Sequence, residues 1–268
     1  MKTSAHSLLD SNAIVKLQER ISRDVLPVDH LYHALCDRLL SRLDVIRMNP
    51  TTILNMSWHT QHSEMQLKKR YPNATIMNVQ HFSDLNLLTD LSFDLVISHF
   101  SLLHENESIL LLHAFSRLLR DEGLLLLSSL GPDSFLELRD SFSVVDHHRH
   151  VHSFLDMHQV GDWMKELHFS DPVMDREDIT LAYDDVNLFF DDLKKCGAVN
   201  VMQLRQRGLL SKNKWKKMLL HYEQFKKDNY FPVTLEMIYG HGWKVSIKND
   251  VDSIDEIMIS VDSIKRNI

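Results

Sequence analysis

The 268-residue sequence predicts an α/β fold in which helices cover both faces of a doubly wound, mostly parallel sheet. The first observation is that three strand–helix–strand units follow one another between residues 51 and 130, an order typical of parallel sheets. The second is the segment "SFDLVISHF" (92–100), whose continuous apolar centre is expected of a strand covered on both faces. Hydrophobic residues make up 44% of the chain and charged residues 25%, as in ordinary globular domains.

The early elements follow from the spacing of the apolar residues. Residues 1–48 are predicted to be helical, because leucines recur at spacings of three and four within 31–43. Short apolar runs at 51–56 ("TTILNM") and 74–79 ("ATIMNV") predict the first two strands. The leucine-rich run at 124–130 predicts a further strand after the one described above.

Three helix starts are predicted from side chains that can cap a helix, one of them at Ser134 and Glu137, which have the spacing of a capping box. Ser63 and Gln66 have the spacing of a capping box, which predicts a helix that runs to about Arg70. Asn106 is predicted to cap another helix that ends near Arg120. These last two helices would connect parallel strands, as the predicted fold requires.

The second half of the chain has a mixed pattern, in which amphipathic runs alternate with extended ones. Helices are predicted at 156–169, 186–198 and 211–228, and strands at 171–183 and 234–247. No internal repeat and no low-complexity linker interrupts this order. The sequence therefore predicts one α/β domain with helical additions.

Composition excludes several classes of function. The net charge of −7 argues against a general nucleic-acid binder, and the longest apolar runs are too short to span a bilayer. The N-terminus lacks the continuous apolar region of a secretion signal. Two distant cysteines, Cys36 and Cys196, fit a reducing compartment. We therefore expect a cytoplasmic protein that binds neither nucleic acid nor membrane.

Four motifs in the second half carry a resemblance to a known family. They are "LRDEGLLLLSSLGPDSFLELRDSF" (119–142), "SFLDMHQVGDWMKELHFSDPVMDREDITLAY" (153–183), "DLKKCGAVNV" (192–201) and "YEQFKKDNYFPVTLEMIYGHGWK" (222–244). With these motifs in this order, the chain resembles the BioC family, the S-adenosylmethionine-dependent malonyl-acyl-carrier-protein O-methyltransferases of biotin synthesis. The likeness covers about 17–243, and the mitochondrial complex I assembly factors share a weaker form of it.

The resemblance implies a class I methyltransferase fold with a seven-stranded, mostly parallel sheet and an antiparallel last strand. It implies that S-adenosylmethionine is the cofactor and that malonyl-acyl carrier protein is the substrate, whose free carboxylate is converted to a methyl ester. It also suggests a division into an N-terminal helical lid (1–48), a methyltransferase-like domain (49–244) with a helical insertion (about 184–228), and a C-terminal extension (245–268).

The turn after the first strand departs from this family. The family's segment reads like "ILDLGCGTG", whereas this chain has "ILNMSWHTQ" (53–61) and no glycine before Gly123. Glycines let such a turn approach a ligand closely, and the family has a carboxylate at the end of the second strand for the ribose hydroxyls. The positions that the resemblance assigns to cofactor binding are Asn55, Ser57, His59, Gln61 and Gln80.

Two further features change the same region. Trp58 and His59 place bulky side chains where the methionine part of the cofactor would lie. Residues 81–92 are too few for the helix and strand that the family has there. The turn is therefore interpreted as the remnant of a cofactor site. Two functions remain open: the family's methyltransferase, and a catalytically silent paralogue without cofactor binding that binds the carrier protein or an assembly partner.

Three residues in or near the matched motifs are predicted to form the catalytic site. A malonyl carboxylate is already ionised at neutral pH, so catalysis depends on positioning and desolvation rather than on a strong base. Arg149 is predicted to bind the carboxylate through two hydrogen bonds, and His158 and Tyr239 to complete the clamp. The alternatives are an exposed loop arginine, a histidine satisfied at a helix start and a core tyrosine.

The histidine-rich segment "DHHRHVH" (146–152) raises the question of a metal site. An extended backbone would place His148, His150 and His152 on one side. No cysteine lies near them in the sequence, and metal plays no part in the chemistry that the resemblance implies. A solvated histidine-rich loop is the preferred interpretation, and no metal is predicted.

The segment 205–227 is strongly basic in a chain that is acidic overall, with Glu223 as its single acid. Such a face is predicted to dock an acidic partner, of which acyl carrier protein is one. The alternative is a solvated helix face with its apolar residues turned inward. The predicted contact residues are Arg205, Arg207, Lys212, Lys214, Lys216 and Lys217.

Overall fold

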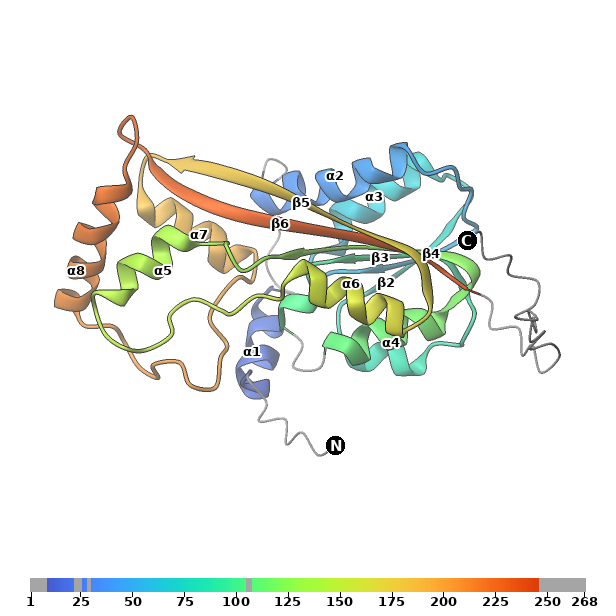
Figure 1. The fold of residues 1–268 in the computed structure, drawn as a ribbon, viewed down its shortest axis with the longest axis horizontal. Helices are drawn as coiled ribbons and strands as arrows, with labels where there is room; N and C mark the ends of the chain where they lie inside the picture. The colour runs from blue at the N-terminus through green and yellow to red at the C-terminus, as the bar shows by residue number, and fades with distance from the viewer. Residues whose placement is uncertain (1–8, 22–25, 28–29, 105–107, 246–268) are drawn as a thin grey trace, which may run out of the picture.

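A computed structural model describes residues 9–21, 26–27, 30–104 and 108–245. Its centre is a six-stranded sheet with the order β2-β1-β3-β4-β6-β5 (Figure 1). The strands are β1 (Thr52–Met56), β2 (Thr75–Val79), β3 (Phe93–His99), β4 (Leu119–Leu130), β5 (Phe169–Tyr183) and β6 (Phe231–Lys244). β1 pairs in parallel with β2 and β3, and β3 with β4, whereas β6 runs antiparallel to β4 and β5. The predicted doubly wound sheet with an antiparallel last strand is confirmed.

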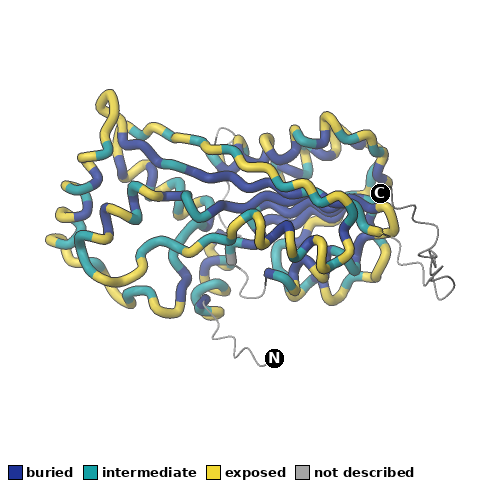
Figure 2. Tube along the Cα trace, viewed as in Figure 1, coloured by how far each residue is buried: buried dark blue, intermediate teal, exposed yellow. Residues whose placement is uncertain are grey.

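Helices cover both faces of this sheet. The α-helices are α1 (Ser11–Ile21), α2 (Leu31–Ser41), α3 (Thr60–Arg70), α4 (Ser108–Leu118), α5 (Leu136–Ser143), α6 (Met157–Glu166), α7 (Val186–Lys195) and α8 (Lys212–Tyr222). Short 3-10 helices are η1 (Arg42–Asp44), η2 (Phe82–Leu87), η3 (Ser101–His104) and η4 (Glu223–Phe225). One core cluster joins the sheet to α2, α3, α5, α7 and α8, and a second joins it to α4 and α6. The central strands β1, β3, β4 and β6 are the most deeply buried part of the sheet, whereas the outer strands β2 and β5 are partly exposed (Figure 2).

The two core clusters explain why β3 is a continuous apolar run. Leu95 and Ile97 belong to the cluster on the α2 and α3 side of the sheet. Val96 belongs to the cluster on the α4 side. All three side chains are fully buried, because successive residues of a strand point to opposite faces and both faces are covered here.

β5 and β6 form a long antiparallel pair that extends past the end of β4. The pairing of β4 with β6 ends at Leu130 and Met237, whereas β5 and β6 stay paired as far as Tyr183 and Phe231. Helices α5, α7 and α8 lie beside this extension, at the left end of the molecule in Figure 1. Together they form a lobe beyond the carboxyl ends of the parallel strands.

Helix α1 packs mainly in a small cluster of its own. Leu17 and Ile21 are buried against Val201 and Met202, with Trp58 at the edge of the cluster. The chain before α1 is joined to the same segment, because its residue 10 donates a backbone hydrogen bond of 2.7 Å to the residue 201 carbonyl. The N-terminal helix therefore rests on the segment after α7 and on the turn after β1.

The strand count that the resemblance implies is corrected. The described chain has six strands rather than seven, and residues 81–92 contain η2 instead of a helix and an edge strand. Twelve residues are too few for both elements, so the segment crosses from β2 to β3 as a short connection. Residues 246–268, almost the whole predicted C-terminal extension, lie outside the described residues.

Two of the three predicted helix starts are wrong. Helix α5 begins at Leu136 with Phe135 at its N-cap position and no side-chain cap, so Ser134 does not cap it. Helix α3 begins at Thr60, one turn before the predicted capping box, and the Ser63 hydroxyl donates to the Thr60 carbonyl at 3.0 Å. The predicted end of this helix at Arg70 is confirmed. Asn106 lies outside the described residues. The helix that it was expected to start ends at Leu118, because the next residue already pairs with β3.

Candidate functional site

The carboxyl ends of β1, β2 and β3 meet at one edge of the sheet, where α/β proteins of this topology bind nucleotide cofactors. β1 ends at Met56, and the turn 57–59 leads directly into α3. β2 ends at Val79 and β3 at His99. We call these strand ends, together with the turn, the cofactor edge.

The turn of the cofactor edge is tied to its own neighbours. The Ser57 N–H donates to the Val79 carbonyl at 3.2 Å, and the hydroxyls of Ser57 and Tyr32 are 2.8 Å apart. The His59 N–H donates to the Ser57 hydroxyl oxygen at 3.2 Å. In a ligand-binding turn such N–H groups are directed at the ligand, whereas these two are used inside the protein.

Tyr32 of α2 lies at the centre of a buried aromatic cluster at this edge, and only 1% of it is exposed. Its ring centroid is 4.9 Å from that of His59 and 4.7 Å from that of His99, with Phe100 at 5.9 Å. The His99 Nδ1 atom is 2.7 Å from the Ser128 hydroxyl. Burial lowers the pKa of His99 to about 3, so its imidazole is neutral at physiological pH. Side chains thus fill the inner part of the cofactor edge.

Trp58 connects the turn to α1 and to the segment after α7. A Cβ atom on Gly197 would lie 2.7 Å from Trp58 Cε3 and 2.5 Å from Ile21 Cδ1, so only glycine fits between these side chains. Gly197 also has a φ of +77°, which glycine adopts without strain. The His59 Nε2 atom lies 3.0 Å from the Lys195 carbonyl. The turn is therefore packed from outside as well as from inside.

The amide side chains of this region also bond mainly to the protein. The Asn55 amide donates to the Ser63 hydroxyl at 2.9 Å and to the Asn78 side-chain oxygen at 2.8 Å. The Gln80 amide donates to the Trp58 carbonyl at 2.9 Å. Asn55 is fully buried, so it supports the start of α3 rather than facing a ligand.

A cavity of about 270 Å³ nevertheless remains on the outer side of the turn. Its lining residues come from the end of α1, the α1–α2 connection, α2, the turn 57–59, the first half of α3 and the residue after β2. They are Ile21, Leu26, His33, Trp58, His59, Thr60, Gln61, His62, Met65 and Gln80. Three of the five predicted cofactor positions, His59, Gln61 and Gln80, are among them. The cavity is slightly smaller than the roughly 300 Å³ at which small-molecule sites begin.

The residues present fit a cofactor held by side chains and by a helix start, but not one held by a glycine turn. Helix α3 begins at this cavity with no side-chain cap, so its first N–H groups can meet a carboxylate. Gln80 supplies an amide in place of a ribose-binding carboxylate. Ser57 and Asn55 are committed to internal bonds. A cavity therefore remains at the place where the fold binds cofactors, with fewer groups that could contact one.

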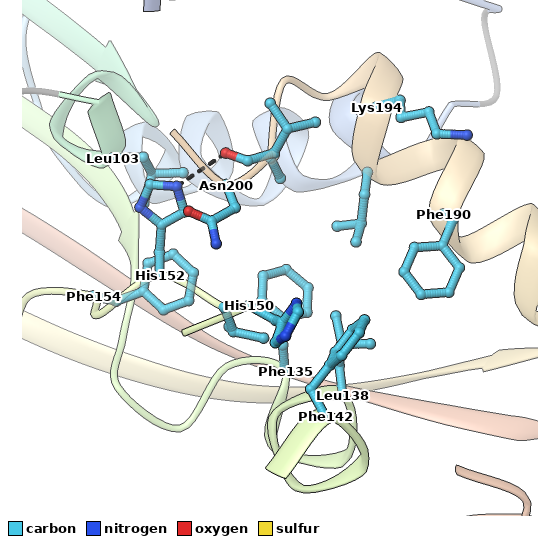
Figure 3. Close-up of a pocket in the computed structure, with 14 residues that line it drawn as sticks. Leu103, Phe135, Leu138, Phe142, His150, His152, Phe154, Phe190, Lys194 and Asn200 are labelled. Carbon is cyan, nitrogen blue, oxygen red and sulfur yellow. Dashed lines mark hydrogen bonds between the residues drawn. The ribbon is translucent and has the colours of Figure 1, made fainter. Parts of the chain in front are cut away.

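A second hollow region lies in the lobe beyond β3 and β4, where three cavities share His152 and Phe154 as walls. The apolar cavity, of about 230 Å³, lies between α5 and α7 (Figure 3). The outer cavity, of about 530 Å³, lies between α5 and the segment 146–154. The inner cavity, of about 300 Å³, reaches Ser129 at the end of β4. We call them together the acceptor cavities.

Arg149 is the predicted catalytic residue that lies at the acceptor cavities, since it lines both the outer and the inner one. Its guanidinium donates to the Ser153 hydroxyl at 3.2 Å and forms no ion pair with another described residue. Its carbonyl accepts a hydrogen bond of 2.7 Å from the Asn200 amide, which fixes its backbone.

His158 and Tyr239 lie elsewhere and do not line these three cavities. The His158 side chain is 79% exposed at the start of α6 and bonds to Asp156 at 2.8 Å. Tyr239 is 1% exposed, donates to Glu177 at 3.1 Å, and has the Arg42 guanidinium 3.2 Å from its ring centroid. The structure therefore does not bring the three predicted catalytic residues together.

The histidine-rich segment is a loop, as expected, but it is solvated only in part: residues 147–149 are exposed, whereas His150 and His152 are half-buried. His150 stacks on Phe142 with ring centroids 4.0 Å apart and bonds to Asp146 at 2.9 Å. His152 lies 2.9 Å from the Val199 carbonyl. These contacts turn the segment into a wall of the acceptor cavities. The part of the chain that the structure describes contains no group of three or more side chains that could hold a metal ion.

The predicted docking residues divide into two groups. Arg205 and Arg207 pair with Asp10 at 3.0 and 3.4 Å, and Lys214 pairs with Asp146 at 2.8 Å. Although burial alone would raise the pKa of Asp146, hydrogen bonds led by that from Lys214 hold it well below its usual range. The other three residues are exposed on α8 and form no ion pair among the described residues. They are Lys212, Lys216 and Lys217.

Several residues of the two sites were not predicted from the sequence. Tyr32 and His99 were not singled out, because their proximity arises from the packing of α2 on the end of β3. His152 and Phe154, the shared walls of the acceptor cavities, lie in or beside matched motifs and so carried a signal that was not used. Arg139 lies at the outer cavity and likewise belongs to a matched motif.

The sheet order, the antiparallel last strand and the ligand edge at the carboxyl ends define a class I methyltransferase fold. Two solved structures share it. A putative methyltransferase from Bacillus halodurans has a TM-score of 0.52 and 14% identity, covering 80% of this chain and 100% of that one. The YcgJ protein of Bacillus subtilis has a TM-score of 0.50 and 12% identity, with the same coverage. At these identities the likeness shows the fold alone.

This chain belongs to the malonyl-[acyl-carrier protein] O-methyltransferase family. It is 36% identical to malonyl-[acyl-carrier protein] O-methyltransferase 1 of Coxiella burnetii, over 96% of this chain and 97% of that protein. Identity to the malonyl-[acyl-carrier protein] O-methyltransferase of Laribacter hongkongensis is 34%, over 80% and 82% of the two chains. No model of a protein family matches the chain. The resemblance seen in the sequence is confirmed.

None of the described helices combines the length and the apolar character that crossing a membrane requires.

Proposed function

We propose that this protein is an S-adenosylmethionine-dependent malonyl-acyl-carrier-protein O-methyltransferase of biotin synthesis. The observation that carries this proposal is the 36% identity to a relative of that name, which extends over 96% of this chain and 97% of the relative. A match along nearly all of both chains includes the sheet and the lobe of α5, α7 and α8 that holds the acceptor cavities, which we call the acceptor lobe. The reaction would join the methyl group to one oxygen of the malonyl carboxylate.

The cofactor would bind in the cavity on the outer side of the turn. When bound, it supplies a methyl group on a positively charged sulfur, which an oxygen nucleophile can attack. Of this chain's residues, the start of α3 would hold its carboxylate, Gln80 would face its ribose, and Trp58 would form an apolar wall. Each missing contact that leaves a polar group of the cofactor unpaired is expected to reduce the binding free energy by about 1–3 kcal/mol. The affinity of this protein for S-adenosylmethionine is therefore expected to be weaker than that of a methyltransferase with glycines in this turn.

The malonyl carboxylate would be held by Arg149. This assignment is supported by the position of Arg149 between the outer and inner cavities and by its lack of an ion pair among the described residues. A bidentate arginine orients a carboxylate and leaves its charge in place. The shared clamp with His158 and Tyr239 has no such support, because neither lines the acceptor cavities.

The carrier protein would dock on α8. Support comes from Lys212, Lys216 and Lys217, which are exposed and form no ion pair among the described residues, so their charge is available to an acidic partner. Arg205, Arg207 and Lys214 are already paired with carboxylates. They would contribute to docking only by exchanging those partners, so α8 supplies the main contact.

The test has two parts on the full-length protein. Isothermal calorimetry with S-adenosylhomocysteine measures whether the cofactor edge binds. An assay of methyl ester formation on malonyl-acyl carrier protein measures the reaction. Binding in the micromolar range together with ester formation would support the proposal. No binding at millimolar ligand and no ester would overturn it.

A second candidate function is favoured by one observation. The Tyr32 hydroxyl bonds to Ser57 inside the cofactor edge, and His59 and His99 pack on the Tyr32 ring, so side chains occupy space that a cofactor turn keeps open. A protein with this edge closed would keep the acceptor lobe and bind malonyl-acyl carrier protein without methylating it. Carrier binding without S-adenosylhomocysteine binding would identify this case.

A further inference from the structure

The apolar cavity of the acceptor lobe is larger and less polar than a malonyl group requires. Six apolar side chains from η3, α5, the residue before α5, and α7 surround it (Figure 3). They are Leu103, Phe135, Leu138, Phe142, Phe190 and Leu193. A malonyl group has a single methylene between two polar carbonyl carbons, so it gains little from such walls. The cavity fits a ligand segment with more apolar surface.

The apolar cavity shares lining residues with the outer cavity and with the inner cavity. It shares Phe142, His150 and Val151 with the outer cavity. It shares Leu103 with the inner cavity, and all three share His152 and Phe154. The apolar cavity therefore adjoins both the outer cavity and the inner cavity at the end of β4.

The outer cavity has a positive lining. Arg139 and Arg149 both line it. Four histidines line it as well, at positions 147, 148, 150 and 152. Its one carboxylate, Asp146, is bonded to Lys214 and His150. Since Lys214 belongs to α8, the proposed docking helix lies directly beside this cavity. A group that enters from a carrier on α8 would meet positive charge first.

A few polar side chains lie at the apolar cavity, and some of them are already bonded within the protein. Asn200 and His152 lie together at one side of the cavity in Figure 3, and Lys194 lies at its rim. The Asn200 side chain already donates to the Arg149 carbonyl, and its oxygen accepts from the Met202 N–H at 3.0 Å. A mainly apolar cavity with a few polar groups at one side is typical of sites that fix an extended ligand.

We propose that the apolar cavity holds the pantetheine part of the carrier protein's prosthetic arm, with its phosphodiester in the outer cavity and its malonyl end in the inner one. The order of environments matches the order of groups in such an arm: an anionic phosphodiester, two methyl groups on a quaternary carbon, two amides, a thioester and a carboxylate. This inference rests on the proposed function, because it assigns the substrate of the same site.

The test compares three malonyl thioesters as methyl acceptors: those of N-acetylcysteamine, of pantetheine and of phosphopantetheine. The wild-type protein is expected to use the pantetheine thioester with a KM about tenfold below that of the short thioester, because the cavity buries the added apolar surface. The phosphate is expected to lower KM again, and added salt to reverse that second gain.

Ala198→Phe fills the apolar cavity from its wall. It is expected to remove the advantage of pantetheine while leaving KM for the short thioester and the affinity for S-adenosylhomocysteine unchanged. Ala198→Leu is a milder version, and retained S-adenosylhomocysteine affinity shows that each variant is folded. Leu188→Phe is the matched control, since Leu188 lies on α7, is 54% exposed and does not line the cavity.

The inference is overturned if the wild type shows no preference for pantetheine, or if Ala198→Phe raises KM equally for the short and long thioesters. Failure of the proposed function would look different, with no ester from any thioester and no S-adenosylhomocysteine binding. In that case, ligand-observed NMR with pantetheine tests directly whether the apolar cavity binds it. Binding to wild type and Leu188→Phe but not to Ala198→Phe supports the site, and no binding or equal binding overturns it.

Discussion

The inner part of the cofactor edge is filled by side chains, whereas the acceptor lobe contains cavities. At the cofactor edge, Tyr32, His59 and His99 are packed together, and the turn bonds to itself through Ser57. In the acceptor lobe, three adjoining cavities remain around His152 and Phe154. Both regions lie beyond the carboxyl ends of the sheet strands, so the fold alone does not decide whether such a region is filled or hollow.

The difference teaches that side-chain size at a few turns decides which site stays open. The cofactor edge has no glycine in its turn, so side chains occupy the space next to the backbone. The loop that leads into the acceptor lobe keeps Gly131, where a Cβ atom would lie 2.3 Å from the Glu236 carboxyl carbon. That loop can therefore pack tightly on β6 and leave the space beyond it free.

The first prediction, for Arg149→Gln, tests whether the acceptor cavities bind the malonyl carboxylate. Arg149→Gln is expected to lower kcat/KM for malonyl-acyl carrier protein by about tenfold to a hundredfold, because the substrate carboxylate would lose a charged partner that is itself exposed before the substrate binds. Affinity for S-adenosylhomocysteine should not change, since Arg149 does not line the cofactor cavity. Arg70→Gln, which breaks an ion pair with Asp44 away from both sites, is the control. An unchanged kcat/KM in Arg149→Gln would separate the acceptor cavities from the reaction.

The next prediction concerns the loop that keeps the acceptor lobe open. Gly131→Ala is expected to lower the free energy of unfolding by about 2–3 kcal/mol, because overpacking must displace Glu236. That carboxylate is held by the Asp133 N–H at 2.6 Å and by Arg176 at 3.1 Å. Urea unfolding measures the loss. Gly161→Ala is the control, since its nearest neighbour is the flexible Met174 side chain at 3.1 Å. Equal stability of both variants would show that Glu236 is not fixed.

A third prediction tests how closed the cofactor edge is. Burial lowers the pKa of His99 to about 3, whereas an unfolded histidine titrates near about 6.5. The unfolded state therefore binds this proton as pH falls below about 6.5, and the native state does not until about pH 3. Stability should fall by about 2 kcal/mol for this group between pH 6.5 and pH 5.

The measurement is urea unfolding of wild type and His99→Asn at both pH values. The variant should lose about 2 kcal/mol less than the wild type over this interval, although other histidines with lowered pKa values, such as His152, add to the slope of both proteins. Parallel slopes would mean that His99 is accessible to protons, and hence that the cofactor edge is open in solution.

The last prediction has the smallest effect and tests whether the turn after β1 is closed by its contact with Tyr32. Tyr32→Phe removes the hydroxyl that bonds to Ser57 at 2.8 Å and is expected to lower the free energy of unfolding by about 1 kcal/mol. Tyr230→Phe is the control, because Tyr230 is 45% exposed and should change stability little. If Tyr32→Phe also raises the affinity for S-adenosylhomocysteine in calorimetry, the Tyr32–Ser57 contact competes with the cofactor. Unchanged stability would show that the contact is not made in solution.

Much of the fold could be predicted because local pattern and burial agree. The apolar run of β3 and the amphipathic run of α8 each specify one element. The structure has β3 where it was predicted and starts α8 where it was predicted, but α8 ends at Tyr222, six residues before the predicted end. The start of α3 was wrong by one turn, because the helix begins directly at the end of the turn, without a side-chain cap on His59. A capping pattern cannot show that a helix starts without a cap.

The sites could be predicted only in part. The positions of the altered turn were found because a known motif aligned with Ser57, His59 and Gln61. The clamp of Arg149, His158 and Tyr239 was predicted from motif order, yet these residues lie on a loop, at a helix start and on a central strand, and their side chains point to different places. His158 faces solvent and Tyr239 packs under Arg42, which no spacing rule indicates.

The sequence by itself determined the family, the order of strands and helices, and the loss of glycine from the cofactor turn, because each is a property of consecutive residues. Only the tertiary structure decided that Tyr32 of α2 reaches Ser57 and that His152 separates three cavities. These contacts join residues from distant segments. Their distances are set by how helices pack on the sheet, and that packing depends on the shapes of all the side chains between them.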